Sequence, residues 1–202
     1  MGSIGNREVN KKVLEDRLKG LLEIVDIIEK YNIDYFLAGG ALLGIYRDNS
    51  FIPWDNDVDI FFKIEDILVI YDDFKSKLNE NNFDIKDEAL NEKYFSFRAY
   101  KYGTRYEFSG FYLNGKYRFN AKPFEMGWKY PKEFFEKSSF IDYRGYRLKT
   151  FYNFEKWLDL QYGDWEIPKR KNYLTYKNRT NYFNPIVRLK YQLKKIYKKY
   201  NE

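Results

Sequence analysis

Two aspartates separated by one apolar residue are the positions in this chain best suited to chemistry. Asp57 and Asp59 flank Val58 within a strongly apolar stretch. Successive side chains of a β-strand point to opposite faces, so a strand here places both carboxylates on one face and Val58 in the core. Two such carboxylates repel each other unless a hard cation lies between them, and carboxylate and phosphate oxygens are the usual ligands of Mg²⁺. The pair therefore predicts a Mg²⁺ site, with Mn²⁺ as the alternative ion.

A pair of glycines precedes the aspartates. Gly39 and Gly40 follow the apolar run 33–38, a predicted strand, and come directly before residues 41–47, a predicted helix. Glycine has no Cβ, so a phosphate can approach its backbone, and a helix N-terminus offers free N–H groups to an anion. The pair predicts a phosphate cradle that faces the two carboxylates. A tight strand-to-helix turn without a ligand is the alternative.

The composition excludes several kinds of site. The chain contains no cysteine and no histidine. It therefore has no disulfide, thiol nucleophile, zinc–thiolate site, Ser-His triad or imidazole base. Acid–base chemistry must fall to Asp, Glu, Lys or Tyr, and a metal ion must accept oxygen ligands.

Hydrophobic periodicity predicts the elements that position these residues. A dipeptide typical of type I′ turns, Asn114-Gly115, separates two of the predicted strands, and Gly163 is placed to end the last helix. The pattern predicts an α+β fold, a mixed sheet flanked by helices, within one domain of residues 1–168. The predicted helices are 8–31, 41–47, 65–80 and 153–162, and the predicted strands are 33–38, 58–62, 93–102, 105–113 and 116–121.

The C-terminal segment differs from the rest in charge. Residues 169–202 hold eleven basic residues and one acidic residue, whereas the whole chain has a net charge of +6, so residues 1–168 are acidic on balance. Apolar positions at three- and four-residue steps predict a basic amphipathic helix at about 185–200. Such a helix either packs on the domain or lies on an anionic membrane surface. The polar N-terminus predicts no signal peptide, and we expect a cytoplasmic protein, at the inner face of the membrane in the second case.

The stretch from Gly39 to Ile60, GGALLGIYRDNSFIPWDNDVDI, resembles the LicD family of phosphocholine and polyol-phosphate transferases, which includes the fukutin-related proteins. The hallmark of that family has the form G-x-L-L-G-x-x-R followed by I-P-W-D-x-D-h-D. Weaker likeness continues at Tyr106-Glu107-Phe108 and at Tyr162-Gly163-Asp164-Trp165, so the resemblance covers roughly residues 33–168. It implies a nucleotidyltransferase fold.

Two positions depart from the family pattern. Glu107 stands where aspartate is commoner, and Asn56 replaces an acid between Asp55 and Asp57. The first departure concerns the third acid of the site. Strand alternation predicts that Asn56 points away from the face of Asp57 and Asp59, so we expect the second departure to be harmless.

The resemblance also implies an activity: transfer of a substituted phosphate from a CDP-linked donor to a hydroxyl of a glycan or glycolipid acceptor, with release of CMP. The catalytic and metal-binding residues that it implies are Asp57, Asp59 and Glu107. Glu107 is either the third ligand of the metal site or the base that accepts the proton of the hydroxyl. Phosphoryl transfer depends mainly on positioning and charge neutralisation, which these residue types can supply.

Five residues form the expected substrate-binding set: Gly39, Gly40, Arg47, Trp54 and Asp55. Arg47 is expected to clamp phosphate oxygens. Trp54 is expected to stack on the base or to contact a quaternary ammonium group. Asp55 either binds the metal or hydrogen-bonds loop N–H groups, and we favour the second role.

Two other functions fit parts of the sequence. A nucleotidyltransferase that attaches NMP to a small molecule or protein shares the fold, although such enzymes usually lack the I-P-W-D element. A non-catalytic module that binds RNA or a membrane fits the aromatic and basic strands of residues 93–121. Because the positive charge is concentrated in residues 169–202 rather than spread over a docking face, we expect no nucleic-acid partner. Basic side chains on the strands and in the segment after them are candidate phosphate contacts or part of a solvated sheet face: Arg98, Lys101, Arg105 and Lys122.

Overall fold

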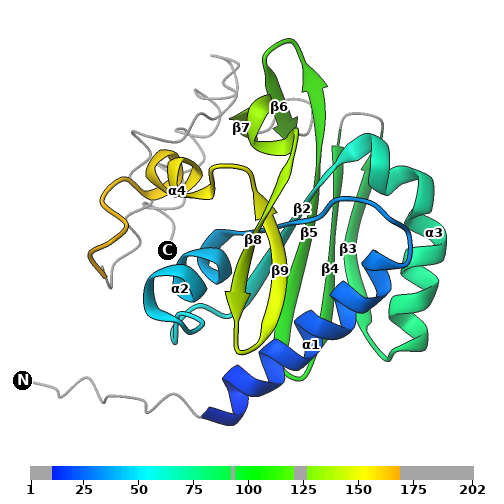
Figure 1. The fold of residues 1–202 in the computed structure, drawn as a ribbon. Helices are drawn as coiled ribbons and strands as arrows, with labels where there is room; N and C mark the ends of the chain where they lie inside the picture. The colour runs from blue at the N-terminus through cyan, green and yellow to red at the C-terminus, as the bar shows by residue number, and fades with distance from the viewer. Residues whose placement is uncertain (1–10, 92–93, 121–126, 169–202) are drawn as a thin grey trace, which may run out of the picture.

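The computed structural model of the 202-residue chain describes residues 11–91, 94–120 and 127–168. Within these ranges, four α-helices and a short 3₁₀-helix (η1) accompany a sheet of nine strands (Figure 1). In chain order the elements are α1 (Lys11–Glu29), β1 (Phe36–Ala38), α2 (Gly39–Asp48), β2 (Asp57–Lys63), α3 (Ile64–Glu80), β3 (Asp84–Asn91), β4 (Tyr94–Lys101), β5 (Thr104–Asn114), β6 (Tyr117–Asn120), β7 (Trp128–Pro131), η1 (Lys132–Phe135), β8 (Ser138–Tyr143), β9 (Tyr146–Phe151) and α4 (Phe154–Tyr162).

The sheet is mixed, as the sequence predicts. Its strand order is β3-β4-β5-β2-β1-β9-β8. Outside this order, β6 pairs with both β5 and β7. The central strand β2 runs parallel to β5 and antiparallel to β1, and β1 runs parallel to β9. Parallel neighbours cannot be joined by a tight turn. The chain passes through α3, β3 and β4 between β2 and β5, and through all the elements from α2 to β8 between β1 and β9. The fold is α+β.

The two faces of β2 and β5 are covered by different helices. On one face, Phe62 and Phe108 pack against Phe74 of α3, with ring centroids 6.5 and 5.6 Å apart. On the other face, Phe61 packs against Trp157 of α4 at 6.4 Å. Figure 1 shows α3 at one side of the sheet, with α2 and α4 together at the opposite side. The strand alternation therefore gives β2 one face toward α3 and another toward α4.

The predicted helices agree closely with the observed ones where the structure describes them. The helix predicted at 41–47 begins two residues earlier, at Gly39, and the strand predicted at 33–38 is confined to Phe36–Ala38. Four strands were not predicted: β3, β7, β8 and β9. Strand β3 is mostly exposed and polar, so it lacks the apolar alternation that marks a half-buried strand.

The predicted type I′ turn at Asn114-Gly115 is wrong by one residue. Asn114 pairs with Tyr117, so Gly115 and Lys116 are the central residues of the turn. Gly115 has φ +59° and Lys116 has no positive φ, which is the type II′ pattern. Glycine at the first central position is what this turn requires, because only that position has positive φ.

The predicted basic helix at about 185–200 and the whole segment 169–202 lie outside the described residues. Among the described helices, none is long and apolar enough to cross a membrane.

Candidate active site

Strand β2 presents its two aspartates on one face. Asp57 and Asp59 are half-buried. Val58, which lies between them, and Ile60, which follows Asp59, are fully buried. Both aspartates line a cavity of about 570 Å³ that α4 also borders. The structure therefore places the two carboxylates on one wall of a single cavity, on the side of the sheet that α3 does not cover.

The first turn of α2 lies directly against two carboxylates. A Cβ atom on Gly39 would lie 1.8 Å from Oδ2 of Asp59, and a Cβ on Gly40 would lie 1.7 Å from Oδ2 of Asp55. Gly39 also has φ +61°, a conformation that other residues rarely adopt. The glycines thus allow two acids to contact a helix N-terminus, where backbone N–H groups favour negative charge. Both glycines line the same cavity.

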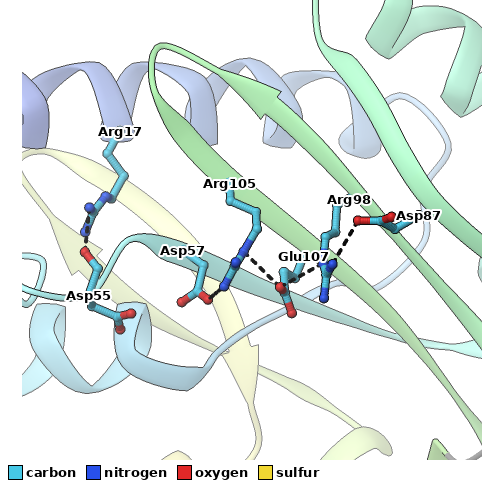
Figure 2. Close-up of polar contacts among 7 residues, drawn as sticks. All are labelled: Arg17, Asp55, Asp57, Asp87, Arg98, Arg105 and Glu107. Atoms are coloured by element: carbon cyan, nitrogen blue, oxygen red, sulfur yellow. Dashed lines mark hydrogen bonds and ion pairs between the residues drawn. The ribbon is translucent and has the colours of Figure 1, made fainter. Parts of the chain in front are cut away.

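Strand β5 contributes a third acid and an arginine beside β2. In the parallel register, Asp57 lies opposite Arg105 and Asp59 lies opposite Glu107. Nη2 of Arg105 donates to Oδ2 of Asp57, and its Nε lies 2.9 Å from Oε1 of Glu107. Figure 2 shows the guanidinium group between these two carboxylates. Arg105 therefore supplies the positive charge next to both acids.

Glu107 is held by a second arginine as well. Nε of Arg98 donates to Oε1 of Glu107 over 3.0 Å, and Nη1 of the same residue donates to Asp87 over 2.8 Å. The result is a row of alternating charge that runs across β2, β5, β4 and β3 (Figure 2). Arg98 and Arg105 are each paired with acidic side chains. They therefore do not belong to a merely solvated sheet face, and a phosphate contact would require them to give up these partners.

The loop before β2 is anchored by a buried arginine. Arg17 of α1 is only 4% exposed, and its Nη2 donates to the main-chain oxygen of Asp55 over 2.7 Å (Figure 2). Burial, a hydrogen bond with Asp57 and the charge of Asp57 together raise the pKa of Asp55 to about 7. The charge of Arg17 and the N–H of Asn56 act in the opposite direction. The main-chain oxygen of Asp55 thus ties the loop to α1, while its carboxylate lies beside Asp57.

Asp59 carries the least compensated charge of the cluster. Burial of its carboxylate, followed by the charges of Asp57, Glu107 and Asp55, raises the pKa of Asp59 well above its ordinary value. Arg105 opposes this shift but does not cancel it. The cluster as a whole therefore has an excess of negative charge that a bound cation would relieve.

The donor set fits a hard divalent cation by its chemistry. Asp57, Asp59, Glu107 and Asp55 offer the oxygen ligands that Mg²⁺ and Mn²⁺ prefer, and they line one cavity. In their present positions, however, no three acidic side chains of the described residues are grouped closely enough to hold one ion. Because Arg105 lies between two of these carboxylates, a cation shared by them requires the guanidinium group to move aside.

Arg47 lines the cavity, but its guanidinium group is already engaged. Nε and Nη2 donate to the carboxylate of Asp48 over 2.8 and 2.7 Å, and Nη1 donates to the main-chain oxygen of Trp165 over 3.0 Å. Arg47 therefore ties the segment that follows α4 to α2. A phosphate clamp, the role expected from the sequence, would require Arg47 to exchange these partners.

Much of the remaining lining is aromatic; we call these rings the aromatic end and the acids the acidic end. Trp54, expected to contact substrate, is 55% exposed and lines the cavity. All four tryptophans of the chain line this one cavity. Their ring neighbours in the lining are Phe61, Tyr130 and Tyr162.

Sequence reasoning missed part of this site. Arg17 was not singled out, although a basic residue within the apolar stripe of a helix is a signal for a buried partner. Trp128, Trp157 and Gln161 were not singled out either, because they come from β7 and α4 and no local motif connects them to the aspartates. Only the tertiary fold brings them to the cavity.

Comparison with known proteins identifies a family. The model of the family described as LicD/FKTN/FKRP, nucleotidyltransferase domain, matches residues 32–153. The chain is 30% identical over 87 residues to the lipopolysaccharide cholinephosphotransferase LicD of Haemophilus influenzae, covering 41% of this chain and 33% of that protein. It is 43% identical over 44 residues to the ribitol 5-phosphate transferase FKRP of Mus musculus and of Homo sapiens, covering 22% of this chain and 9% of theirs. The chain thus aligns with no more than a third of the length of these relatives.

The fold has a counterpart among solved structures. The solution structure of the antibiotic-resistance factor ANT(2'')-Ia superposes with a TM-score of 0.52 at 12% identity, covering 82% of this chain and 81% of that one. At this identity the likeness concerns the fold alone.

Proposed function

Because the chain belongs to the LicD/FKTN/FKRP nucleotidyltransferase-domain family, we propose that it is a metal-dependent phosphotransferase. In this proposal it moves a substituted phosphate, phosphocholine or a polyol phosphate, from a CDP-linked donor to a hydroxyl of a surface-glycan acceptor and releases CMP. The names of the relatives support transfer of such groups, since one is a cholinephosphotransferase acting on lipopolysaccharide and two are ribitol 5-phosphate transferases.

One observation carries the proposal: the two aspartates of β2 and the glycine turn of α2 meet in one cavity. A diphosphate in that cavity would lie between a helix N-terminus and a group of oxygen ligands. These are the two kinds of site that bind phosphate directly and through a cation. The cavity, at about 570 Å³, has the size of a small-molecule site.

The reaction needs one bond to form and one to break. The oxygen of the acceptor hydroxyl forms a bond to the phosphorus that carries the substituent, and the bond from that phosphorus to the bridging oxygen of the diphosphate breaks. CMP leaves with the electron pair, in line with the incoming oxygen. The proton of the hydroxyl passes to a carboxylate.

The residues of the cavity divide these tasks. Asp57 and Asp59 would hold Mg²⁺ or Mn²⁺, which when bound would neutralise the diphosphate. Glu107 is positioned either to complete that ligand set or to accept the proton of the hydroxyl. Arg105 lies between Asp57 and Glu107 and bonds to both, so it fixes where their carboxylates lie. Arg17 fixes the loop that carries Asp55.

The test is CMP release from CDP-choline, CDP-glycerol and CDP-ribitol by the purified chain, with Mg²⁺ or Mn²⁺ and with saccharide acceptors. We expect release from at least one ester that EDTA abolishes and Asp57→Asn removes. Asp142→Asn, an exposed acid on β8, is the matched control and should leave release unchanged. Metal-dependent release of pyrophosphate from nucleoside triphosphates, without CMP from any ester, would instead support NMP transfer.

The cytoplasmic location and the membrane contact of residues 169–202 stay predictions of the sequence. Fractionation of cells that express the full chain, compared with a variant in which Lys194, Lys195, Lys198 and Lys199 are replaced by glutamine, tests both.

A further inference from the structure

The β8–β9 hairpin, which forms one edge of the sheet (Figure 1), differs in charge from the rest of the described domain. Its strands and turn carry three bases, Arg144, Arg147 and Lys149, and one acid, Asp142. Residues 1–168 as a whole are acidic on balance. In the part of the chain that the structure describes, the cationic groups of these three bases contact aromatic rings rather than acids.

The bases of β9 point to the same face of the sheet as the acids of the cavity. Arg147, Lys149 and Phe151 alternate along β9, so their side chains share one face. Phe151 stacks on Phe36 of β1 with ring centroids 5.2 Å apart, and Phe36 lies opposite Phe61 of β2. Phe61 shares its face of β2 with the two aspartates of that strand.

An exposed ring lies beside these bases. Phe140 of β8 lies opposite Lys149, so both side chains are on the same face of the hairpin. The ring is 42% exposed, and Cζ of Arg147 lies 4.2 Å from its centroid. The hairpin thus presents a large apolar side chain to solvent together with unpaired positive charge.

The turn of the hairpin adds a third base at a fixed position. Tyr143 pairs with Tyr146, so Arg144 and Gly145 are the central residues of the turn. Both have positive φ, +49° and +85°, which is the type I′ pattern that matches the twist of the flanking strands. Arg144 is exposed at this tip, next to Tyr146, whose side chain is 48% exposed.

Protection of the sheet edge does not explain this arrangement. Edge strands are commonly protected from pairing by charges of their own, especially lysine. Here the edge strand is β8, which exposes Phe140 and carries only the acid Asp142, whereas the bases lie on β9 and in the turn.

Neutralisation by neighbouring acids is the usual arrangement of exposed bases elsewhere on the domain. Three bases illustrate it, with nitrogen-to-oxygen distances of 2.6, 2.7 and 3.2 Å: Lys75 to Glu88, Lys77 to Glu80 and Lys132 to Glu136. The hairpin has no such pairs, although Asp142 lies directly opposite Arg147. Its positive charge therefore remains available to an anionic partner.

We propose that this surface, the hairpin face, binds an anionic lipid bilayer. It consists of Phe140, Arg144, Tyr146, Arg147 and Lys149. Basic side chains are attracted to the negative surface of anionic lipids, and aromatic side chains are enriched where water meets the bilayer. The inference goes beyond the reaction, because binding to lipid requires neither donor nor metal.

The position of the hairpin favours a bilayer over a nucleic acid. A nucleic acid needs a row of cations that follows several phosphates. A strand laid from the hairpin face across the same side of the sheet would meet the acids of β2 and be repelled. A bilayer is flat and touches only the projecting edge, and the ring of Phe140 can leave water by entering the headgroup region.

One consequence concerns the direction of the cavity. Because the hairpin face and the acids of β2 lie on one side of the sheet, binding through the hairpin turns that side toward the bilayer. This orientation suits a hydroxyl acceptor that is attached to a lipid.

The experiment is co-sedimentation of the full chain with lipid vesicles, without donor or metal. One set of vesicles is phosphatidylcholine alone, and the other contains about 30% phosphatidylglycerol, which supplies the negative surface. We expect binding to the anionic vesicles only, and weaker binding as the salt concentration rises.

A triple variant of the hairpin face locates the binding. Arg144→Gln, Arg147→Gln and Lys149→Gln together remove the three bases, each of which contributes about fivefold near an anionic surface. Because these charges also act in concert with residues 169–202, we expect the triple variant to bind the anionic vesicles at least about tenfold more weakly.

The matched control removes the same charge from another part of the surface. Lys75→Gln, Lys77→Gln and Lys132→Gln together replace three exposed bases that are already paired with acids. This variant should bind the vesicles nearly as well as the unmodified chain. Melting temperatures of the two triple variants establish that both are folded.

Two single variants should shift binding in opposite directions. Phe140→Ser removes the exposed ring and should weaken binding by a part that salt does not affect. Asp142→Asn removes the one acid of the hairpin and should strengthen binding, by up to about fivefold.

Three results would overturn the inference: no binding of the full chain to anionic vesicles, an equal loss in the two triple variants, or binding that the hairpin variant leaves unchanged. The last result would assign lipid binding to residues 169–202. None of these results bears on CMP release with a soluble acceptor, which tests the proposed function separately.

Discussion

The acidic and aromatic ends of the cavity are built in opposite ways. The acids Asp55, Asp57 and Asp59 alternate along a loop and a strand, so their spacing alone places them together. The rings of the aromatic end come from the loop before β2, from β2 itself, from β7, from α4 and from the segment after α4. Local sequence order fixes the first end, and the tertiary fold fixes the second.

The two ends also differ in what they contribute to stability. Trp157 is fully buried and stacks on Phe151, so the aromatic end is continuous with the core and stabilises it. Asp59 is placed against other carboxylates with incomplete compensation, which costs stability in the absence of a cation. Substitutions at the acidic end should therefore change chemistry without unfolding the chain, whereas those at the aromatic end should change specificity and, in its buried part, stability.

The largest effect is expected from the aspartates of β2. Asp57→Ala and Asp59→Ala should each abolish CMP release, because loss of a direct metal ligand exceeds the roughly 10–100-fold cost of losing an outer partner. The melting temperature of the metal-free chain should be unchanged for Asp57→Ala and unchanged or higher for Asp59→Ala, since like charges are removed. Turnover assays and thermal melts with EDTA measure the two effects.

Asp142→Ala on β8 is the control for this pair. It removes an exposed acid of the same sheet and should alter neither quantity. Turnover that survives in either β2 variant, or a melting temperature that falls by many degrees in both, would show that these acids serve the fold rather than the reaction.

The glycine pair allows a finer test of the acidic end. Gly40→Ala would place a Cβ 1.7 Å from Oδ2 of Asp55, so this flexible side chain must move, and we expect a loss of activity of about 10–100-fold with a nearly normal melting temperature. Gly39→Ala meets Asp59 and also adopts φ +61°, so it should in addition destabilise the fold by about 1–2 kcal/mol.

Gly103→Ala is the comparison for these two variants. Gly103 has φ +71° in the β4–β5 turn and open space around it. Its replacement by alanine should therefore lower the free energy of unfolding through backbone strain but leave the activity unchanged. If Gly40→Ala were fully active, contact between the α2 turn and Asp55 would be irrelevant to the reaction.

The sequence predicts the part of this site that lies within one stretch of chain. Strand alternation placed Asp57 and Asp59 on one face, and the glycine turn lies beside them as expected, because neighbouring residues leave few arrangements open. The fold class is predictable for the same reason, because the hydrophobic periodicity of the helices before and after β2 is a local pattern. Glu107, the third acid that the resemblance implied, lies opposite Asp59, and this position is set by the pairing of β2 with β5 rather than by a local pattern.

What could not be predicted depends on partners that are distant in sequence. Arg47 was expected to bind phosphate, yet its guanidinium group bonds to the main-chain oxygen of Trp165, which lies 118 residues later in the sequence. Arg105 was one of several candidate cations, and only the pairing of β2 with β5 identifies it as the one between two acids. Strand β3 escaped prediction because pairing with β4, rather than burial, makes it a strand.

Arg105 offers a smaller effect that tests how the acidic end is compensated. Its guanidinium group bonds to Asp57 and lies beside Glu107, so it competes with a cation for these oxygens. Arg105→Gln should therefore bind Mn²⁺ about three- to tenfold more tightly in the absence of a donor, the magnitude of one partly exposed charge pair. Titration calorimetry measures the affinity.

Arg98→Gln is matched to this variant. Arg98 contacts Glu107 and Asp87 but not Asp57, so its removal should change Mn²⁺ affinity less. Weaker Mn²⁺ binding by Arg105→Gln would mean that the guanidinium group supports the metal site instead of competing for it.

The smallest effect concerns the dependence of stability on pH. Burial and neighbouring acids raise the pKa of Asp55 to about 7 and raise the pKa of Asp59 as well, whereas an unfolded aspartate titrates near 3.8. Between these values the folded chain binds more protons than the unfolded chain, so the free energy of unfolding falls as pH rises from about 4 through 7. With EDTA present, we expect a melting temperature a few degrees higher at pH 5.5 than at pH 8.

Two changes should remove this slope, and both act only at the acidic end. Asp55→Asn and Asp59→Asn each lack one of the two carboxyl groups with a raised pKa, so each should reduce the slope between pH 5.5 and 8, and the double variant should remove it. Saturating Mn²⁺ should reverse it, because the cation competes with protons for the same oxygens and binds better as they ionise. Trp128→Phe, at the aromatic end, should shift the curve without changing its slope. A slope that is unchanged in both Asn variants would place the responsible groups elsewhere in the molecule and remove the contrast between the two ends.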